Sequence, residues 1–204
     1  MYFRLRWNND VSLDLHGEPS HYIYEYVGDI VVHSECDFGK NCQIVGKFEC
    51  SYVNSDIALN EGIDFFELFD HSSELMAYYE YIFDMDDGGI KDDINALFND
   101  EIFGLNLLVI SRLEILPDFR RNNLGLKVMD FVVNRFGSGA GLVLIKPYPL
   151  QFESERLHHD DWYKELKLEC LSSDQSCAFR KLKDYYSKIG FVEIPATPFM
   201  GRIP

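Results

Sequence analysis

The residues best suited to chemistry lie in a short polar turn between two apolar segments. Residues 107–128 read LLVISRLEILPDFRRNNLGLKV, with Arg120 and Arg121 in the turn and Gly125 at the start of the second segment. The first backbone N–H groups of a helix have no partner within the helix and carry partial positive charge. A helix that begins after a strand and two arginines therefore predicts a binding site for a phosphate or diphosphate.

A strand and a helix must position this turn. The apolar run that ends before Pro117 predicts a buried strand. After the turn, apolar side chains recur at helical spacing and predict a helix that extends to residue 136. The expected buried face of this helix consists of Leu124, Val128, Phe131, Val132 and Phe136. The predicted strand and helix would then fix the two ends of the turn.

This strand, turn and helix resemble the acetyl-CoA-binding motif of the GNAT superfamily of N-acetyltransferases. The family pattern is an apolar strand, Val-x-Pro, an aromatic residue, and Arg/Gln-x-x-Gly-x-Gly/Ala at the helix start. In this chain the pattern runs from Ile115 to Gly125, with Arg120 at the Arg/Gln position. Asn123 stands where the family usually has its first glycine, and asparagine tolerates left-handed backbone angles better than most residues.

A second stretch near the C-terminus resembles the same family. Residues 178–194 read AFRKLKDYYSKIGFVEI, which is similar to the family's late helix and following strand, Phe-Tyr-x-Lys-x-Gly-Phe. Tyr185 and Tyr186 stand at the two aromatic positions of that pattern. Gly190 predicts the end of a helix, and Phe191 predicts the start of a strand. The two motifs follow the family order, and the resemblance covers the second half of the chain.

The resemblance implies how this chain would hold acetyl-CoA. In the family, the pantetheine arm lies in a gap between the fourth and fifth strands and pairs with strand backbone. The expected cofactor-binding residues are therefore Leu113, Ile115 and Leu116 on the strand, and Arg120, Arg121, Asn122, Asn123, Leu124, Gly125 and Leu126 in the turn and helix start. Amides of the turn would hold the diphosphate, and the two arginines would add charge-assisted contacts.

Acetyl transfer to an amine requires three things. The amine must be neutral and aimed at the thioester, the developing oxyanion must be stabilised, and the leaving thiolate must receive a proton. By the resemblance, Tyr186 is the general acid toward the coenzyme A sulfur. A phenol with an ordinary pKa near ~10 keeps its proton at neutral pH. Tyr185, one residue earlier on the helix, is expected to point into the core.

The general base stays open at this point. Glu114 is the carboxylate of the central strand, but strand alternation points it away from the side of Leu113. Ser111 shares the orientation of Leu113 and is able to relay a proton through water. Asp84 or Asp86 of the N-terminal half, or a water chain with no dedicated base, are further alternatives.

The charge of the chain differs between its two halves. Residues 1–100 hold 21 acidic and 5 basic side chains, whereas residues 101–204 hold 13 acidic and 14 basic side chains. An acidic acceptor wall favours a cationic acceptor such as a polyamine, an aminoglycoside, or a lysine or N-terminus of a protein. The alternative is that the acidity only aids solubility. Nucleic acid is not an expected partner, because phosphate contacts require a basic face.

The chain as a whole predicts a single α/β (α+β) domain over residues 1–204. Expected strands cover 2–7, 23–35, 42–53 and 142–145, and helical periodicity covers 62–83, with a break near 71–73, and a short stretch ending at 98. The expected buried side of the first helical stretch is Phe65, Phe66, Phe69, Leu75, Met76 and Tyr79.

The resemblance refines this prediction of the fold. It implies a GNAT-like, mixed and mostly antiparallel central sheet that is splayed between the fourth and fifth strands. Helices would cover both faces, with a helical insert before the fourth strand. Residues 1–104 would form the acceptor-side half and residues 105–204 the acetyl-CoA-binding half. A long connection at 146–176 either folds over the acceptor site as a lid or packs on the outside.

Several other features predict no metal and no membrane. The five cysteines lack zinc spacing, the acidic run at 84–95 does not fit a calcium loop, and adjacent side chains at 158–161 rarely converge on one ion. No apolar run approaches the ~20 residues that span a bilayer. The first ten residues lack the apolar core of a secretory signal, from which we expect a cytoplasmic protein with free thiols.

Together these patterns predict an N-acetyltransferase that transfers an acetyl group from acetyl-CoA to a primary amine by direct attack. The acceptor would be a small-molecule amine or a protein amine. The alternative is a catalytically inactive coenzyme A-binding or protein-interaction module of the same fold. The acceptor, the acyl-chain preference and the oligomeric state stay open, with a homodimer as one alternative.

Overall fold

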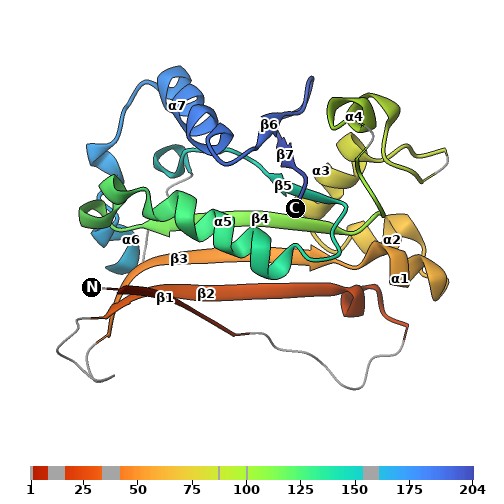
Figure 1. Cartoon of the computed structure of the whole chain (residues 1–204), viewed down its shortest axis with the longest axis horizontal. Helices are drawn as coiled ribbons and strands as arrows, with labels where there is room; N and C mark the ends of the chain where they lie inside the picture. The colour runs from red at the N-terminus through yellow and green to blue at the C-terminus, as the bar shows by residue number, and fades with distance from the viewer. Residues whose placement is uncertain (1, 9–16, 34–41, 87, 100, 154–160) are drawn as a thin grey trace.

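Seven strands form one sheet, in the order β1-β2-β3-β4-β5-β7-β6, in a computed structural model of the chain (Figure 1). The structure describes residues 2–8, 17–33, 42–86, 88–99, 101–153 and 161–204, without the side chains of Arg121 and Asn122. The strands are β1 (Tyr2–Asn8), β2 (Ile23–His33), β3 (Cys42–Val53), β4 (Leu107–Ile115), β5 (Leu142–Ile145), β6 (Val192–Glu193) and β7 (Met200–Arg202). Only β4 and β5 pair in parallel among these strands. The expected mixed, mostly antiparallel sheet is confirmed.

Helices fill the connections on either side of the central strands. The α-helices are α1 (Ser55–Asn60), α2 (Phe65–Phe69), α3 (Ser73–Ile82), α4 (Asp92–Leu97), α5 (Leu124–Phe136), α6 (Asp161–Glu165) and α7 (Gln175–Ser187), and 3-10 turns include η2 (Pro117–Asn122), η3 (Leu150–Phe152) and η5 (Leu168–Cys170). The first four helices lie between β3 and β4, as expected. The predicted break in the first helical stretch is confirmed, because the Ser72 hydroxyl accepts a hydrogen bond from the Leu75 amide and starts α3.

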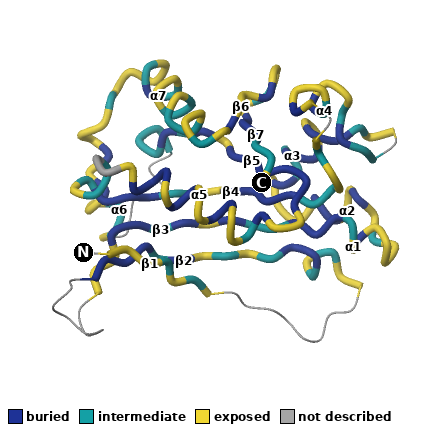
Figure 2. Tube along the Cα trace, in the orientation of Figure 1, coloured by how far each residue is buried: buried dark blue, intermediate teal, exposed yellow. Residues whose placement is uncertain are grey.

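Two apolar cores lie on opposite faces of the sheet. Leu107 and Val109 of β4 face a core that contains α1 to α4, whereas Leu108 and Ile110 face a core that contains α5. Side chains alternate along a strand, so a strand that is covered on both faces is apolar at every position. Figure 2 shows β4 buried along most of its length. Within the described residues, no helix combines the length and apolar character needed to span a membrane.

Two of the expected core residues are exposed instead. Phe131 of α5 is 46% exposed and Phe66 of α2 is 52% exposed. On α5 the expected Leu124, Val128 and Val132 are buried, and the buried stripe also takes in Met129 and Val133 in place of Phe131. Phe65 and Phe69, four residues apart, fill the core on α2 and leave Phe66 turned outward. Both predictions were wrong because a helix buries a stripe narrower than its set of apolar residues.

The central strand β4 has two unlike halves. Residues 107–110 pair with 142–145 of β5, but β4 continues for five more residues without a β5 partner. At the junction, the register of β3 and β4 shifts, so that Ser111 has no Cα partner on β3. Such a β-bulge bends a strand and re-aims its side chains. We call residues 107–110 the paired half of β4 and residues 111–115 its open half.

Candidate functional site

A cavity of about 450 Å³ lies where β4 and β5 part. Its floor is the last strand pair, Ile110 and Ile145, and one wall is the open half of β4. The opposite walls come from α5, from α7 and from the connection that follows β5. Most of the lining is apolar, as is usual for a pocket that encloses part of an organic ligand.

The charged side chains around this cavity are all cationic. Arg112, Arg120, Lys146 and Lys181 line it, and the described lining contains no aspartate or glutamate. The whole chain carries a net charge of −15, so this surface has the opposite sign to its surroundings. Arg112 is in an ion pair, but the other three cations form none among the described residues. The cavity therefore suits an anionic ligand.

The turn before α5 has the backbone geometry that the sequence predicts. Asn123 adopts φ 53° and ψ 23°, which is left-handed, and this confirms the expectation for the position. The first hydrogen bond inside the helix runs from the Lys127 amide to the Asn123 carbonyl, 3.1 Å away. The amides of Leu124, Gly125 and Leu126 precede it and have no partner within the helix. The backbone of this turn is described, but the side chains of 121 and 122 lie outside the described part.

Arg120 has a structural partner at each end of its guanidinium. Its Nε donates to the carbonyl of Ile115 at 2.7 Å, and its Nη2 donates to the carbonyl of Leu166 at 2.6 Å. Burial lowers the pKa of Arg120 from its ordinary value, although an arginine keeps its charge in a protein. Arg120 thus joins the end of β4 to α6 and still presents a positive charge to the cavity.

The two tyrosines of α7 take different places. The Tyr185 hydroxyl accepts a hydrogen bond from the Leu126 amide at 3.0 Å, so Tyr185 lies at the helix start and not in the core, as had been expected. The Tyr186 ring packs against Phe191, and burial, followed by the nearby Tyr185, raises its pKa. Both tyrosines line the cavity. The Tyr186 hydroxyl has no hydrogen-bond partner among the described residues.

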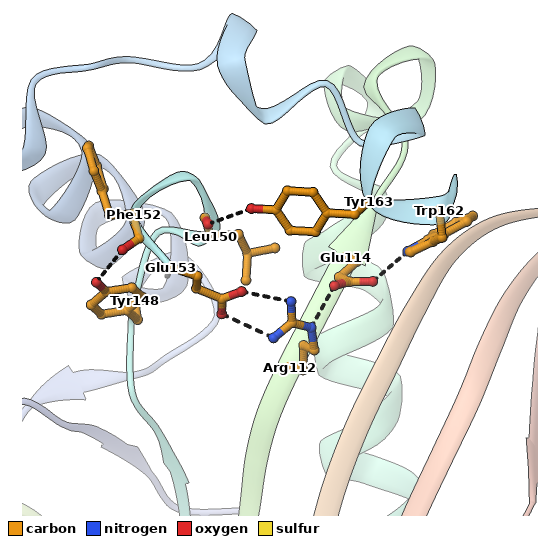
Figure 3. Close-up of polar contacts among 8 residues, drawn as sticks. All are labelled: Arg112, Glu114, Tyr148, Leu150, Phe152, Glu153, Trp162 and Tyr163. Atoms are coloured by element: carbon orange, nitrogen blue, oxygen red, sulfur yellow. Dashed lines mark hydrogen bonds and ion pairs between the residues drawn. The ribbon is translucent and has the colours of Figure 1, made fainter. Parts of the chain in front are cut away.

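Glu114 points away from the cavity into a polar network (Figure 3). It is 5% exposed, and its Oε1 accepts from Nε of Arg112 at 2.6 Å while its Oε2 accepts from the indole N–H of Trp162 at 2.6 Å. Arg112 also makes a two-point contact with Glu153, at 3.1 and 2.9 Å. Burial opposes the charge of Arg112, but its bonds to Glu153 and Glu114 outweigh this and raise its pKa. The network joins β4 to both ends of the segment between 153 and 162.

The described parts of the connection at 146–176 pack against the end of β4 and line the cavity. Leu166 and Leu168 pack with Leu116 in a small separate core. The ammonium of Lys47 lies 4.7 Å from the ring centre of Trp162, which fixes the same segment to β3. Leu150 and other residues of the connection line the cavity. Whether the segment also covers an acceptor site stays a prediction.

Some expected site residues come together and others do not. Ser111, Leu113, Ile115, Arg120, Gly125 and Tyr186 all line the cavity. Glu114, Leu116, Leu124 and Leu126 do not line it with their side chains, and neither do Asp84 and Asp86, which lie in the turn between α3 and α4.

The sequence reasoning missed three of the cations, Arg112, Lys146 and Lys181. Lys181 precedes Tyr185 by one helical turn, and this spacing was a signal that it shares the cavity face. Among the described residues no cluster of histidine, cysteine or acidic side chains is arranged to hold a metal, and Cys42, Cys50, Cys170 and Cys177 are free thiols. The candidate at 158–161 lies outside the described residues except for Asp161.

No family model, no curated protein and no solved structure matches this chain. The cavity and its lining are therefore the basis for any functional conclusion.

Proposed function

We propose that the protein is a GNAT-like, acetyl-CoA-dependent N-acetyltransferase that acetylates a primary amine. The observation that carries the proposal is the separation of β4 from β5 at the bulge of Ser111, beside the start of α5. Beyond Ile110, β4 has no β5 partner, so an extended ligand could pair with its backbone up to the Ile115 carbonyl, which Arg120 already bonds. The helix start lies beside the same cavity, which three cations without an ion pair among the described residues also line, as a ligand with phosphates requires.

The diphosphate would lie at the first turn of α5. Left-handed Asn123 turns the chain so that the amides of Leu124, Gly125 and Leu126 come together at the end of the helix. Lys146 and Lys181 add positive charge at the cavity. The pantetheine arm would extend along Leu113 and Ile115 toward the bulge.

The reaction would form one bond and break another. The amine nitrogen attacks the thioester carbonyl carbon, and the carbon–sulfur bond then breaks as the oxyanion collapses. Tyr186 donates its phenolic proton to the leaving thiolate. Because burial raises the pKa of Tyr186, its hydroxyl stays protonated at neutral pH and is able to act as a proton donor.

The amine must also lose a proton, and no carboxylate among the described residues lines the cavity. Ser111 is exposed, lines the cavity and lies at the bulge. We assign proton removal to water that is held at Ser111. Both oxygens of Glu114 already accept hydrogen bonds, so we assign Glu114 to the positioning of β4 and not to proton transfer.

The acceptor amine would be positively charged in solution, before it binds. On the sheet face opposite α5, burial raises the pKa of the Glu49 carboxyl, Arg112 opposes the shift, and Glu114, Glu74 and Glu153 add to it. Arg112 and Lys47 are the cations near these four carboxylates, which leaves this face negative. Such a face attracts a polyamine or a lysine side chain more than a neutral amine.

A release assay tests the proposal. The protein would be mixed with acetyl-CoA and a panel of polyamines, aminoglycosides, amino acids and lysine peptides, and free thiol would be measured. We expect thiol release with a cationic acceptor and slower release by the Tyr186→Phe variant, with acetyl-CoA binding retained. Absence of release with every acceptor would contradict the enzymatic proposal.

The second candidate is a coenzyme A-binding module without turnover. The observation that favours it is the lack of a carboxylate base at the cavity among the described residues. Calorimetric binding of acetyl-CoA together with absence of thiol release would support this candidate over the enzyme. Absence of binding at millimolar acetyl-CoA would contradict both.

A further inference from the structure

The Tyr185 hydroxyl accepts a hydrogen bond from one of the backbone amides that a diphosphate would use. Its phenolic oxygen lies 3.0 Å from the Leu126 nitrogen, at the third residue of α5. That amide belongs to the first turn, where no backbone carbonyl is within reach. The amide is therefore satisfied by a side chain from α7, which lies 59 residues away in the sequence.

The fit between Tyr185 and the helix start depends on Gly125. A Cβ atom on Gly125 would lie 2.7 Å from the Tyr185 hydroxyl and 3.5 Å from Cδ2 of Leu113. The first distance is too short for a real contact, so any larger residue would push the phenol away from the helix. Gly125 thus permits an oxygen atom to reach the amides here, and Tyr185 supplies that oxygen.

An anionic oxygen would be a better partner for this amide than a phenol. Hydrogen bonds to a charged oxygen are about twice as strong as those between neutral groups. The positive end of α5 also favours a negative charge. The Leu126 amide has one proton, so a phosphoryl oxygen and the phenol compete for it.

We propose that Tyr185 is a specificity-determining residue, whose hydroxyl holds the Leu126 amide until a phosphoryl oxygen of the ligand displaces it. The inference rests on the proposed function, because it takes the diphosphate of coenzyme A as the incoming anion. A ligand without phosphate leaves Tyr185 in place and gains nothing from the helix start. Tyr185 thereby lowers the affinity for phosphate-bearing ligands alone, and so narrows the preference for coenzyme A over pantetheine.

The Tyr185→Phe variant tests the competition. Loss of the hydroxyl leaves the Leu126 amide without its internal partner, so coenzyme A should bind more tightly, by about two- to tenfold. Pantetheine, which has no phosphate, should bind the variant and the wild-type protein equally. Both affinities would be measured by calorimetry, with thermal unfolding as the check that the variant is folded.

Tyr148→Phe is the matched control. Tyr148 also lines the cavity, but its hydroxyl donates to the Phe152 carbonyl at 2.8 Å and not to a ligand-facing amide. This variant should show no gain in coenzyme A affinity. Equal gains in Tyr148→Phe and Tyr185→Phe would overturn the inference, as would weaker or unchanged binding of coenzyme A to Tyr185→Phe.

If the Tyr185→Phe variant fails to fold, an NMR measurement on the wild-type protein tests the same inference. The amide resonance of Leu126, followed by NMR, should shift on addition of coenzyme A and stay in place on addition of pantetheine. Binding of coenzyme A without a shift of this resonance would refute the inference and leave the proposed function intact. Absence of coenzyme A binding would instead refute the proposed function, and the inference with it.

Discussion

The two halves of β4 differ in what lies beside their backbone edges. The paired half has β3 on one side and β5 on the other, and its four side chains are all buried and apolar. The open half has β3 on one side and a cavity on the other. There an arginine and a glutamate take the place of apolar residues and contact the connection that follows β5 (Figure 3).

The difference separates stability from binding within one strand. Backbone pairing and two apolar cores hold the paired half, and of its side chains only Ile110, at its end, lines the cavity. The open half has no strand on its cavity side, where Arg120 bonds the Ile115 carbonyl. Changes at 107–109 should therefore alter stability alone, whereas changes around the open half should alter ligand binding as well.

The largest loss of stability is expected from removing the buried ion pair that holds the open half of β4. Arg112→Met removes the partner of Glu114, which is almost fully buried, and of Glu153. Breaking such a pair costs about 3–5 kcal/mol of unfolding free energy. Urea denaturation would measure this loss, and calorimetry would measure the expected loss of acetyl-CoA affinity.

The double variant Arg112→Met, Glu114→Met is the control for this prediction. It removes both charges of the pair and should recover part of the stability that the single variant loses. A single variant as stable as the wild-type protein would show that the network does not hold the open half.

A similar loss of stability is expected in the paired half, without an effect on binding. Leu108 is fully buried between β4 and α5, so Leu108→Ala should lower the unfolding free energy by about 2–5 kcal/mol. Leu59→Ala, at an exposed leucine of α1, should change it by less than about 0.5 kcal/mol. A change in acetyl-CoA affinity for folded Leu108→Ala would break the division between the halves.

The smallest expected effect is on how the unfolding free energy depends on pH through Glu49. Its pKa is raised in the folded protein, so the folded state binds a proton more readily than the unfolded state. Stability should therefore fall as pH rises from the ordinary pKa of glutamate through the raised value, and Glu49→Gln should flatten this dependence. Urea denaturation at a series of pH values would measure it. A steeper dependence in Glu49→Gln would contradict the assigned direction.

Much of the cavity could be predicted from local signals. The apolar run before Pro117 predicted a buried strand, and Asn123 was expected to tolerate left-handed angles. These predictions depend on residues close together in the sequence. The glycine that follows α7, Gly190, has φ 88°, in line with the predicted helix end.

The features that could not be predicted from the sequence depend on contacts between residues far apart in the chain. Strand alternation gave the direction of Glu114 but not its contact with Trp162, which lies 48 residues away. The contact of Arg112 with Glu153 spans 41 residues and was likewise out of reach. Helical spacing could not decide which of Tyr185 and Tyr186 faces the start of α5. That choice depends on how α7 packs on α5, and the empty side of Gly125 is what admits Tyr185.

Hydrogen exchange with and without acetyl-CoA tests the central claim most directly. The account predicts that acetyl-CoA slows exchange in the open half of β4 and at 124–126, with little change in the paired half. Binding that protects the paired half equally, or that leaves both the open half and the start of α5 unprotected, would contradict it.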